Sequence, residues 1–85
     1  MVYEIIFSEK AESQFKKLER NVQERIISVL ERIRARPEIY AVKLIGDPGY
    51  KIRVGNYRVI IDIDRDNLRI LVIKLGHRRA IYKDL

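Results

Sequence analysis

The sequence predicts an α+β fold in which two helices cover one face of a mainly antiparallel sheet. Apolar residues recur at helical spacing between about residues 9 and 35, after a short segment rich in β-forming residues. From residue 49 onward, apolar residues alternate with charged ones or form short runs between turn signals, as strands do. The expected order is β-α-α-β-β-β: an N-terminal strand, a helical hairpin and an antiparallel three-strand meander.

The first strand and the first helix are expected to meet at Ser8. The segment Val2–Phe7 predicts a strand whose odd-numbered residues share one face. The Ser8 hydroxyl can then accept a hydrogen bond from a free amide of the following helical turn, which makes it the expected N-cap. The helix is expected from Glu9 to about Leu18. Its apolar face comprises Ala11, Phe15 and Leu18.

A second helix is expected from Asn21 to about Ala35, antiparallel to the first. Asn21 with Glu24 three residues later resembles a capping box. Pro37 is expected to end this helix, because a proline disfavours the α conformation in the residue before it. The apolar stripe of the helix comprises Val22, Ile26, Val29, Leu30 and Ile33.

The clearest strand pattern is the run Gly49–Asp62, which predicts a β-hairpin. Gly55-Asn56 interrupts the alternation, and a two-residue loop that starts with Gly suits a type II′ turn. The expected pairs are Val54 with Tyr57, Arg53 with Arg58, and Ile52 with Val59. Tyr50 and Tyr57, like Tyr3, then fall on apolar faces and are interpreted as packing residues.

The same register puts Lys51, Arg53 and Arg58 on the face opposite the apolar side chains. Two arginines directly opposite each other cost stability, so the pair favours a role in binding an anion. Because the helices need an apolar partner face, these cations are expected on the open face of the sheet. The alternative is that they are ordinary solvent-facing strand residues, which is the usual meaning of alternating charge.

The remaining segments are assigned by their turn signals. Residues Glu38–Pro48 are expected to form a connector, and Asp64–Asn67 a second turn. The last strand is expected at Leu68–Leu75 and is apolar on both faces over Ile70–Ile73, so it should lie inside the sheet. Gly76 is expected to end it before a short tail.

Composition limits the classes of function. The chain has 85 residues, a net charge of +6 and a pI near 9.8, which predict one domain with an acidic partner. It has no Cys and one His, so no disulfide, metal or cofactor is expected. Asp62, Asp64 and Asp66 lack the downstream Gly and Glu of a calcium loop. Without a membrane span or signal peptide, a soluble, cytoplasmic protein is expected.

The tail adds His77, Arg78, Arg79 and Tyr82 to the cations of the hairpin. Arginines can stabilise charge on a phosphate, a lysine can take part in proton transfer, and a tyrosine can stack on a base. Such a cluster has the groups for cleaving RNA without metal, because RNA supplies its own 2′-hydroxyl nucleophile. The alternative interpretations are a solvated tail and a structural histidine.

The sequence resembles the RelE family of toxins, within the RelE/ParE superfamily of toxin–antitoxin systems. The residues that carry the resemblance are Lys43-Leu44-x-Gly46, Tyr50-Lys51-Ile52-Arg53-Val54-Gly55-x-Tyr57-Arg58-Val59, Ile73-x-x-Gly76-His77-Arg78, and Tyr82. RelE-like toxins resemble microbial ribonucleases in fold and cleave messenger RNA in the ribosomal A site. The resemblance therefore implies a ribosome-dependent endoribonuclease that inhibits translation.

The resemblance also implies roles for individual residues. Lys51 and Arg53 match the two basic positions of the family strand, and Arg58 matches the arginine that contacts the scissile phosphate. Arg78 matches the late arginine that assists the leaving group, and Tyr82 matches the tyrosine that stacks on the base. Secondary substrate-binding positions are Arg79, His77 and Lys43. Attack by the 2′-hydroxyl would leave a 2′,3′-cyclic phosphate.

The implied partners are messenger RNA, the ribosome and a small, acidic RelB-like antitoxin that wraps around the toxin in a hetero-oligomer. Two alternatives remain open. The first is a ParE-like toxin of the same fold, which inhibits DNA gyrase without cutting RNA. The second is a non-catalytic basic RNA-binding module, for which each lost cation would lower the salt dependence of binding.

Overall fold

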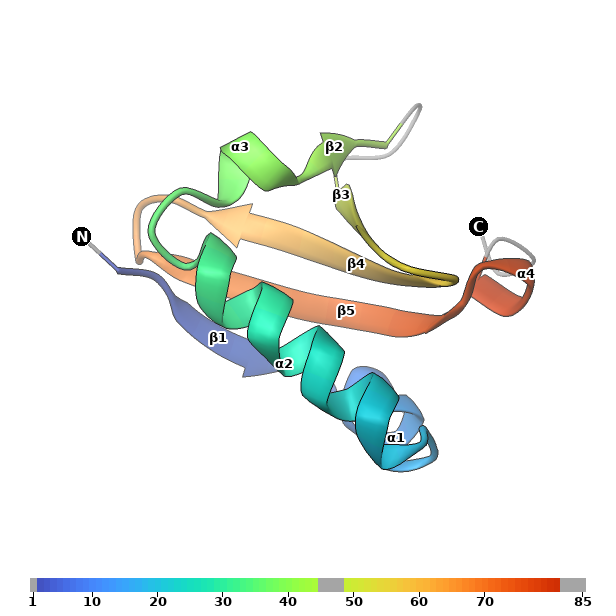
Figure 1. Cartoon of the computed structure of the whole chain (residues 1–85). Coiled ribbons are helices and arrows are strands. Elements are labelled where there is room, and N and C mark those ends of the chain that lie inside the picture. Colours follow the sequence, from blue (N-terminus) through green and yellow to red (C-terminus); the bar gives the residue numbers. More distant parts are fainter. Residues whose placement is uncertain (1, 45–48, 82–85) are drawn as a thin grey trace.

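The computed structural model describes residues 2–44 and 49–81 (Figure 1). Nine elements follow one another along this part of the chain. They are β1 (Glu4–Phe7), α1 (Glu9–Lys16), α2 (Arg20–Ile33), α3 (Pro37–Tyr40), β2 (Val42–Lys43), β3 (Tyr50–Val54), β4 (Tyr57–Asp64), β5 (Arg69–His77) and α4 (Arg78–Ile81). The predicted α+β order is confirmed, and the expected connector contains α3 and β2 in addition.

The strands form one sheet in the order β1-β5-β4-β3-β2. The expected meander is present as β3-β4-β5, and the last strand lies inside the sheet as predicted. The sheet is mixed, because β1 pairs with β5 in the parallel direction. This pairing joins the first strand of the chain to the last one. The alternation of residues along a strand does not indicate which other strand it pairs with.

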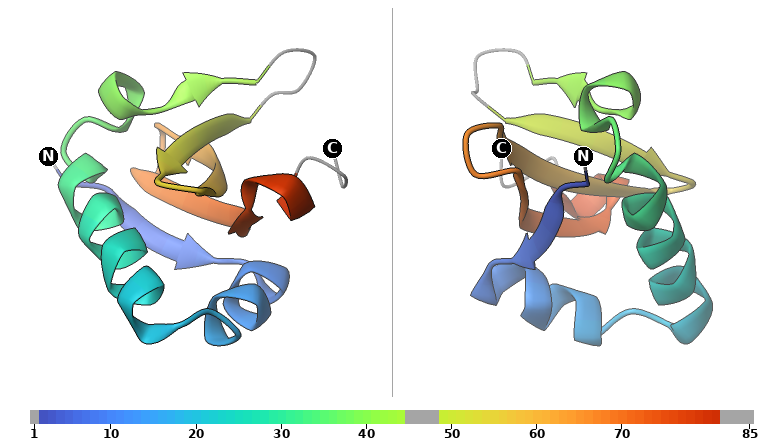
Figure 2. Two further views of the ribbon diagram at one scale, coloured as in Figure 1. Left: turned by 45° about the vertical axis from the view of Figure 1, so that its right-hand side comes forward. Right: turned by 90° about the vertical axis from the view of Figure 1, so that its left-hand side faces the viewer.

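The helices α1 and α2 lie on one side of the sheet, and they diverge from each other rather than packing side by side (Figure 2). Their buried residues meet the inward-facing residues of the sheet in one core. Tyr3, Tyr50 and Tyr57 pack against this core, which confirms their interpretation as packing residues. The opposite face of β3, β4 and β5 is therefore the face that α1 and α2 leave uncovered.

Ser8 caps α1 as predicted and also anchors the helix to the sheet. Its Oγ accepts a hydrogen bond from the Ala11 N–H at 3.0 Å and donates one to the Ile73 carbonyl at 2.6 Å. Further along α1, the Gln14 Oε1 accepts a hydrogen bond from the Leu75 N–H at 2.9 Å. Because β1 pairs only with Arg69–Val72, these side chains bond the edge of β5 that β1 does not reach.

The predicted N-cap of α2 is wrong by two positions. The helix begins at Arg20 with Glu19 as its N-cap residue, so Asn21 lies inside the first turn and the expected capping box does not form. Glu24 instead lies 3.4 Å from the Arg20 side chain in an ion pair one turn away. The first helix also ends earlier than expected, at Lys16.

The end of α2 lies two residues before the predicted one. The helix ends at Ile33, and Arg36, the residue before Pro37, has a non-helical φ of −144°, as expected next to a proline. Pro37 itself opens α3. A link to the first strand follows the helix: the Arg34 carbonyl accepts a hydrogen bond from the Tyr3 N–H at 2.9 Å, and the Arg34 side chain donates to the Tyr3 carbonyl at 2.9 Å. This tertiary contact holds the backbone after Ile33 against β1.

The predicted hairpin is confirmed in full. The expected pairs are those of the structure, and Gly55 has a φ of 59°. Leu68 is the one residue other than glycine with positive φ in the described part of the chain, so Asn56 has the negative φ of a type II′ turn. The last strand differs from its prediction, since β5 begins at Arg69 and runs through Gly76 to His77.

We expect Gly55→Ala to destabilise the protein by at least about 1 kcal/mol, because a side chain at this φ is strained. The added Cβ would also lie 2.6 Å from the Arg25 Nη2, which must move away. Gly76→Ala is the matched control, since its Cβ would meet no atom of the described chain within 4 Å. Urea unfolding should show a reduced midpoint for Gly55→Ala alone; equal losses in both variants would contradict the special role of Gly55.

Candidate functional site

The antiparallel register places the expected cations in two rows across the uncovered face. One row contains Arg53, Arg58 and Gly76 at paired positions of β3, β4 and β5. The next row contains Lys51, Ile60 and Lys74. Side chains at paired positions share a face, so Lys51, Arg53 and Arg58 lie together on the face away from α1 and α2. The sequence prediction of this face is confirmed.

Arg58 is held rigidly, and Arg53 is not. The Arg58 side chain is only 7% exposed, and its Nη1 donates hydrogen bonds to the Gly55 carbonyl at 2.9 Å and the Tyr57 carbonyl at 2.8 Å. These carbonyl dipoles stabilise the guanidinium and offset part of the repulsion from its paired neighbour. Arg53 is exposed to solvent. The pair therefore combines a fixed cation with an accessible one.

The start of α4 lies beside the turn of the hairpin. The Arg78 N–H donates a hydrogen bond to the Asn56 carbonyl at 2.8 Å, and α4 contacts both β4 and β5. Arg78 and Arg79 are exposed, as expected for groups that meet a ligand or solvent. The Gly55-Asn56 turn, called the hairpin tip below, thus touches both Arg58 and Arg78 through its carbonyl groups. Tyr82 lies outside the described residues.

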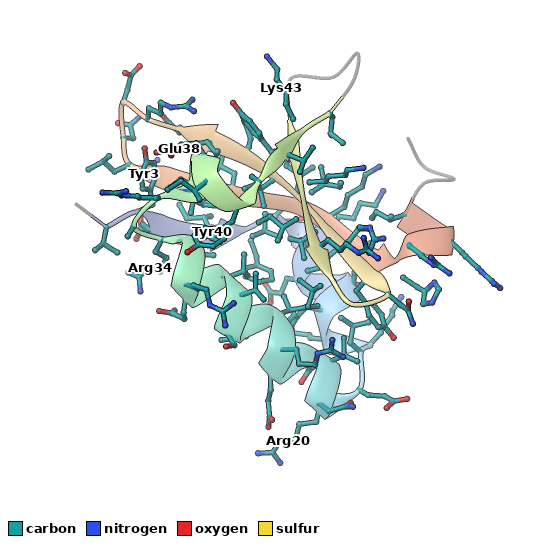
Figure 3. The ribbon with its side chains drawn as sticks, turned by 45° about the horizontal axis from the view of Figure 1, so that its top comes forward. Tyr3, Arg20, Arg34, Glu38, Tyr40 and Lys43 are labelled. Atoms are coloured by element: carbon teal, nitrogen blue, oxygen red, sulfur yellow. The ribbon has the colours of Figure 1, made fainter. Side chains whose placement is uncertain are left out.

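Two of the secondary positions lie away from these cations. His77 pairs with Tyr57, and their rings lie 5.5 Å apart in an edge-to-face contact. Because Tyr57 packs against the core under the helices, His77 is on the opposite face from Arg58. Lys43 pairs with Tyr50 at the other end of β3, about 13 Å along the strand from Val54. Figure 3 shows Lys43 pointing away from the sheet.

A match to the family model of the ParE toxin of the type II toxin–antitoxin system parDE covers residues 5–82. The chain is also 31% identical over 81 residues to the mRNA interferase toxin RelE of Escherichia coli, covering 92% of this chain and 85% of that protein. This chain belongs to the RelE/ParE superfamily of type II toxins.

Solved structures of this superfamily have the same fold. A chain of the intact E. coli RelBE toxin–antitoxin complex matches with a TM-score of 0.77 at 30% identity, covering 88% of this chain and 95% of that one. A chain of the toxin–antitoxin complex RelBE2 from Mycobacterium tuberculosis matches with a TM-score of 0.85 at 18% identity, covering 92% of this chain and 100% of that one. The second likeness concerns the fold alone.

The structure adds Lys74 to the basic face of this RelE/ParE chain, a residue that the sequence analysis missed. Lys74 is 9% exposed and pairs with Ile60, whose other neighbour is Lys51. Strict alternation from Val72 would turn Lys74 toward the core. A bulge opposite Ile60 and Ile61 inserts Ile73 as an extra residue and reverses the alternation after it. The signal available in the sequence was a lysine within an otherwise apolar run.

Asp62 and Asp64 of this RelE/ParE chain share the uncovered face with Arg58, because they follow it at alternate positions of β4, toward the end of the strand away from the hairpin tip. Hydrogen bonds from the Asn67 side chain and backbone lower the pKa of Asp64, which shapes the second turn. Within residues 2–44 and 49–81, no group of three or more Asp, Glu or His side chains could hold a metal ion. No helix in these ranges is long and apolar enough to cross a membrane. The cations of the uncovered face gather at its hairpin-tip end, and the two carboxylates lie at the other end of β4.

The two paired arginines of the RelE/ParE hairpin should respond differently to truncation. Arg58→Ala is expected to lower the free energy of unfolding by about 2 kcal/mol, because two hydrogen bonds from a charged donor are lost. Arg53→Ala should leave it within about 0.5 kcal/mol or raise it slightly, since a like-charge pair disappears. Urea unfolding measures both. A larger loss for Arg53→Ala than for Arg58→Ala would contradict the assignment of the fixed cation.

Proposed function

We propose that this protein is the mRNA interferase toxin of a type II toxin–antitoxin system. It would be a metal-independent endoribonuclease that cuts messenger RNA in the ribosomal A site and so inhibits translation. The observation that carries the proposal is the pairing of Arg53 with Arg58 on the uncovered face, with Arg78 bonded to the same hairpin tip. The relative named mRNA interferase toxin RelE supports the same activity.

In the proposed reaction, the 2′-hydroxyl of RNA attacks the adjacent phosphorus and the bond to the 5′-oxygen breaks. The products are a 2′,3′-cyclic phosphate and a new 5′-hydroxyl. One proton leaves the 2′-oxygen and one reaches the departing 5′-oxygen, so the step needs no metal and no further reactant. Charge builds up on the non-bridging oxygens of the phosphate, where fixed cations lower the barrier most effectively.

Each cation has a proposed role that follows from its position. Arg58 binds the scissile phosphate, because its guanidinium is already held by two carbonyls and needs no reorganisation. Arg53 and Lys51 stabilise charge and assist proton transfer at the attacking oxygen. Arg78 assists the leaving group from the far side of the hairpin tip. Tyr82 stacks on the base in this proposal.

The proposed partners are messenger RNA on the ribosome and a cognate antitoxin. A RelB-like antitoxin, small and acidic, suits a protein with a net charge of +6. The relative from E. coli was solved as a RelBE toxin–antitoxin complex, which supports a hetero-oligomer here. A protein that acts on ribosomes would work in the cytoplasm.

The matching family model is that of the ParE toxin, so a ParE-like mode without RNA cleavage is the second candidate. Primer extension on messenger RNA after induction of the toxin distinguishes the two. Discrete cuts within codons support the interferase. Intact message together with DNA damage supports the ParE-like mode, and intact message with RNA binding supports a non-catalytic module.

Arg78→Ala is the sharpest test of the catalytic assignment. The substitution keeps the backbone N–H that bonds the Asn56 carbonyl, so the fold should persist. We expect RNA cleavage on ribosomes to fall by about 100-fold or more, with loss of growth inhibition and retained antitoxin binding.

Arg69→Ala is the control, because it removes the same charge from the opposite end of β5 and breaks only a long ion pair to Glu4 at 3.8 Å. It should cleave RNA at the normal rate. Full toxicity of Arg78→Ala would show that the catalytic assignment is wrong.

A further inference from the structure

A groove lies between α2 and β3, next to the hairpin tip. It has a volume of about 550 Å³, and its lining includes Arg25, Ser28 and Arg32 from α2 and Arg53 and Gly55 from the hairpin. We call it the tip groove. Figure 2 shows the hairpin of β3 and β4 between α2 and α4. The tip groove is therefore on the α2 side of the hairpin tip, and Arg78 is on the α4 side.

The tip groove is cationic. Within residues 2–44 and 49–81, no ion pair joins Arg25, Arg32 or Arg53 to a carboxylate. Glu24 also lines the groove, but its carboxylate pairs with Arg20. Arg53 belongs to the uncovered face and contributes to this lining at the edge of β3, where β2 no longer pairs with it, so three exposed arginines border a single hollow. Guanidinium groups bind phosphate oxygens through paired donors, so this lining suits a chain of phosphates.

The tip groove and the proposed cleavage face meet at Gly55. The Arg25 Nη2 lies 2.6 Å from the position that a Cβ on Gly55 would occupy, and the Arg58 Nη1 donates to the Gly55 carbonyl at 2.9 Å. Arg25 and Arg58 therefore flank the same glycine. Arg53, which pairs with Arg58, also lines the groove. A polyanion bound by Arg58 would therefore need to extend only past Gly55 to contact Arg25.

We propose that the tip groove binds an RNA phosphodiester backbone next to the cleaved phosphate; this proposal rests on the interferase function above. Arg25 and Arg32 are seven residues apart on one face of α2, about 10 Å along its axis, so they can contact separate phosphates. The RNA is either the flank of the message or ribosomal RNA beside it. An amphipathic protein helix would need a row of apolar anchors, whereas Val29 and Val54 are the groove's only aliphatic side chains among the described residues.

The test uses Arg25→Ala/Arg32→Ala in the Arg78→Ala background, which should bind RNA without cutting it. The control is Arg36→Ala/Arg69→Ala in the same background, which removes the same charge from exposed positions outside the groove. Binding is measured to single-stranded RNA of about 4 and about 12 nucleotides, to ribosomes, and to the antitoxin, across a range of salt concentrations. Urea unfolding confirms that each variant folds.

For the longer RNA, the groove variant should bind about tenfold more weakly, and its salt slope should fall by about 1.4 units for two lost phosphate contacts. Affinity for the shorter RNA should match that of the control. This result supports the groove with the message as its RNA. A loss seen with ribosomes alone also supports the groove and assigns ribosomal RNA.

Equal RNA and ribosome binding by the groove variant and its control would overturn the proposal. Weakened binding to the antitoxin alone would also overturn it and assign the groove to a protein partner. Because none of these measurements requires cleavage, they stand apart from the test of Arg78. A protein that binds RNA through the groove and never cuts it would contradict the interferase function and leave the groove in place.

Discussion

The φ of Gly55 is the constraint on which the functional face depends. A two-residue turn fixes the register of the strands that it joins, and the type II′ geometry requires a positive φ at its first position. This register places Arg53 opposite Arg58, and the turn's two carbonyl groups bond Arg58 and the backbone of Arg78. The close approach of Arg25 to the same glycine also needs the absence of a Cβ. One turn therefore positions cations from α2, β4 and α4.

The hairpin was predictable because all of its information is local. Alternation over residues 49–62 specifies which side chains share a face, and the Gly55-Asn56 pair specifies where the chain reverses. The opposed arginines followed from these two facts alone. Ser8 as the N-cap of α1 was predictable for the same reason, since an N-cap bonds within its own turn.

The features that were missed depend on contacts between distant segments. Arg34 is bonded to Tyr3 on both its backbone and its side chain, a contact that no pattern near residue 34 indicates. The parallel pairing of β1 with β5 has no local pattern. The bulge at Ile73 exists only against its partner strand, and it decides that Lys74 faces outward. His77 was assigned by its nearness to Arg78 in sequence, but strand alternation puts it on the other face.

The bonds from Ser8 and Gln14 to β5 have a consequence for the isolated toxin. Beyond the end of β1, the edge of a central strand would present free N–H and C=O groups, which can template pairing with another chain. Here the side chain of Ser8, the N-cap of α1, donates a hydrogen bond to the Ile73 carbonyl, and the side chain of Gln14 within α1 accepts one from the Leu75 N–H. Helix α1 thus protects the molecule from edge-to-edge aggregation at the place where β5 extends toward Arg78. A toxin released from its partner keeps this protection, because it is built from its own chain.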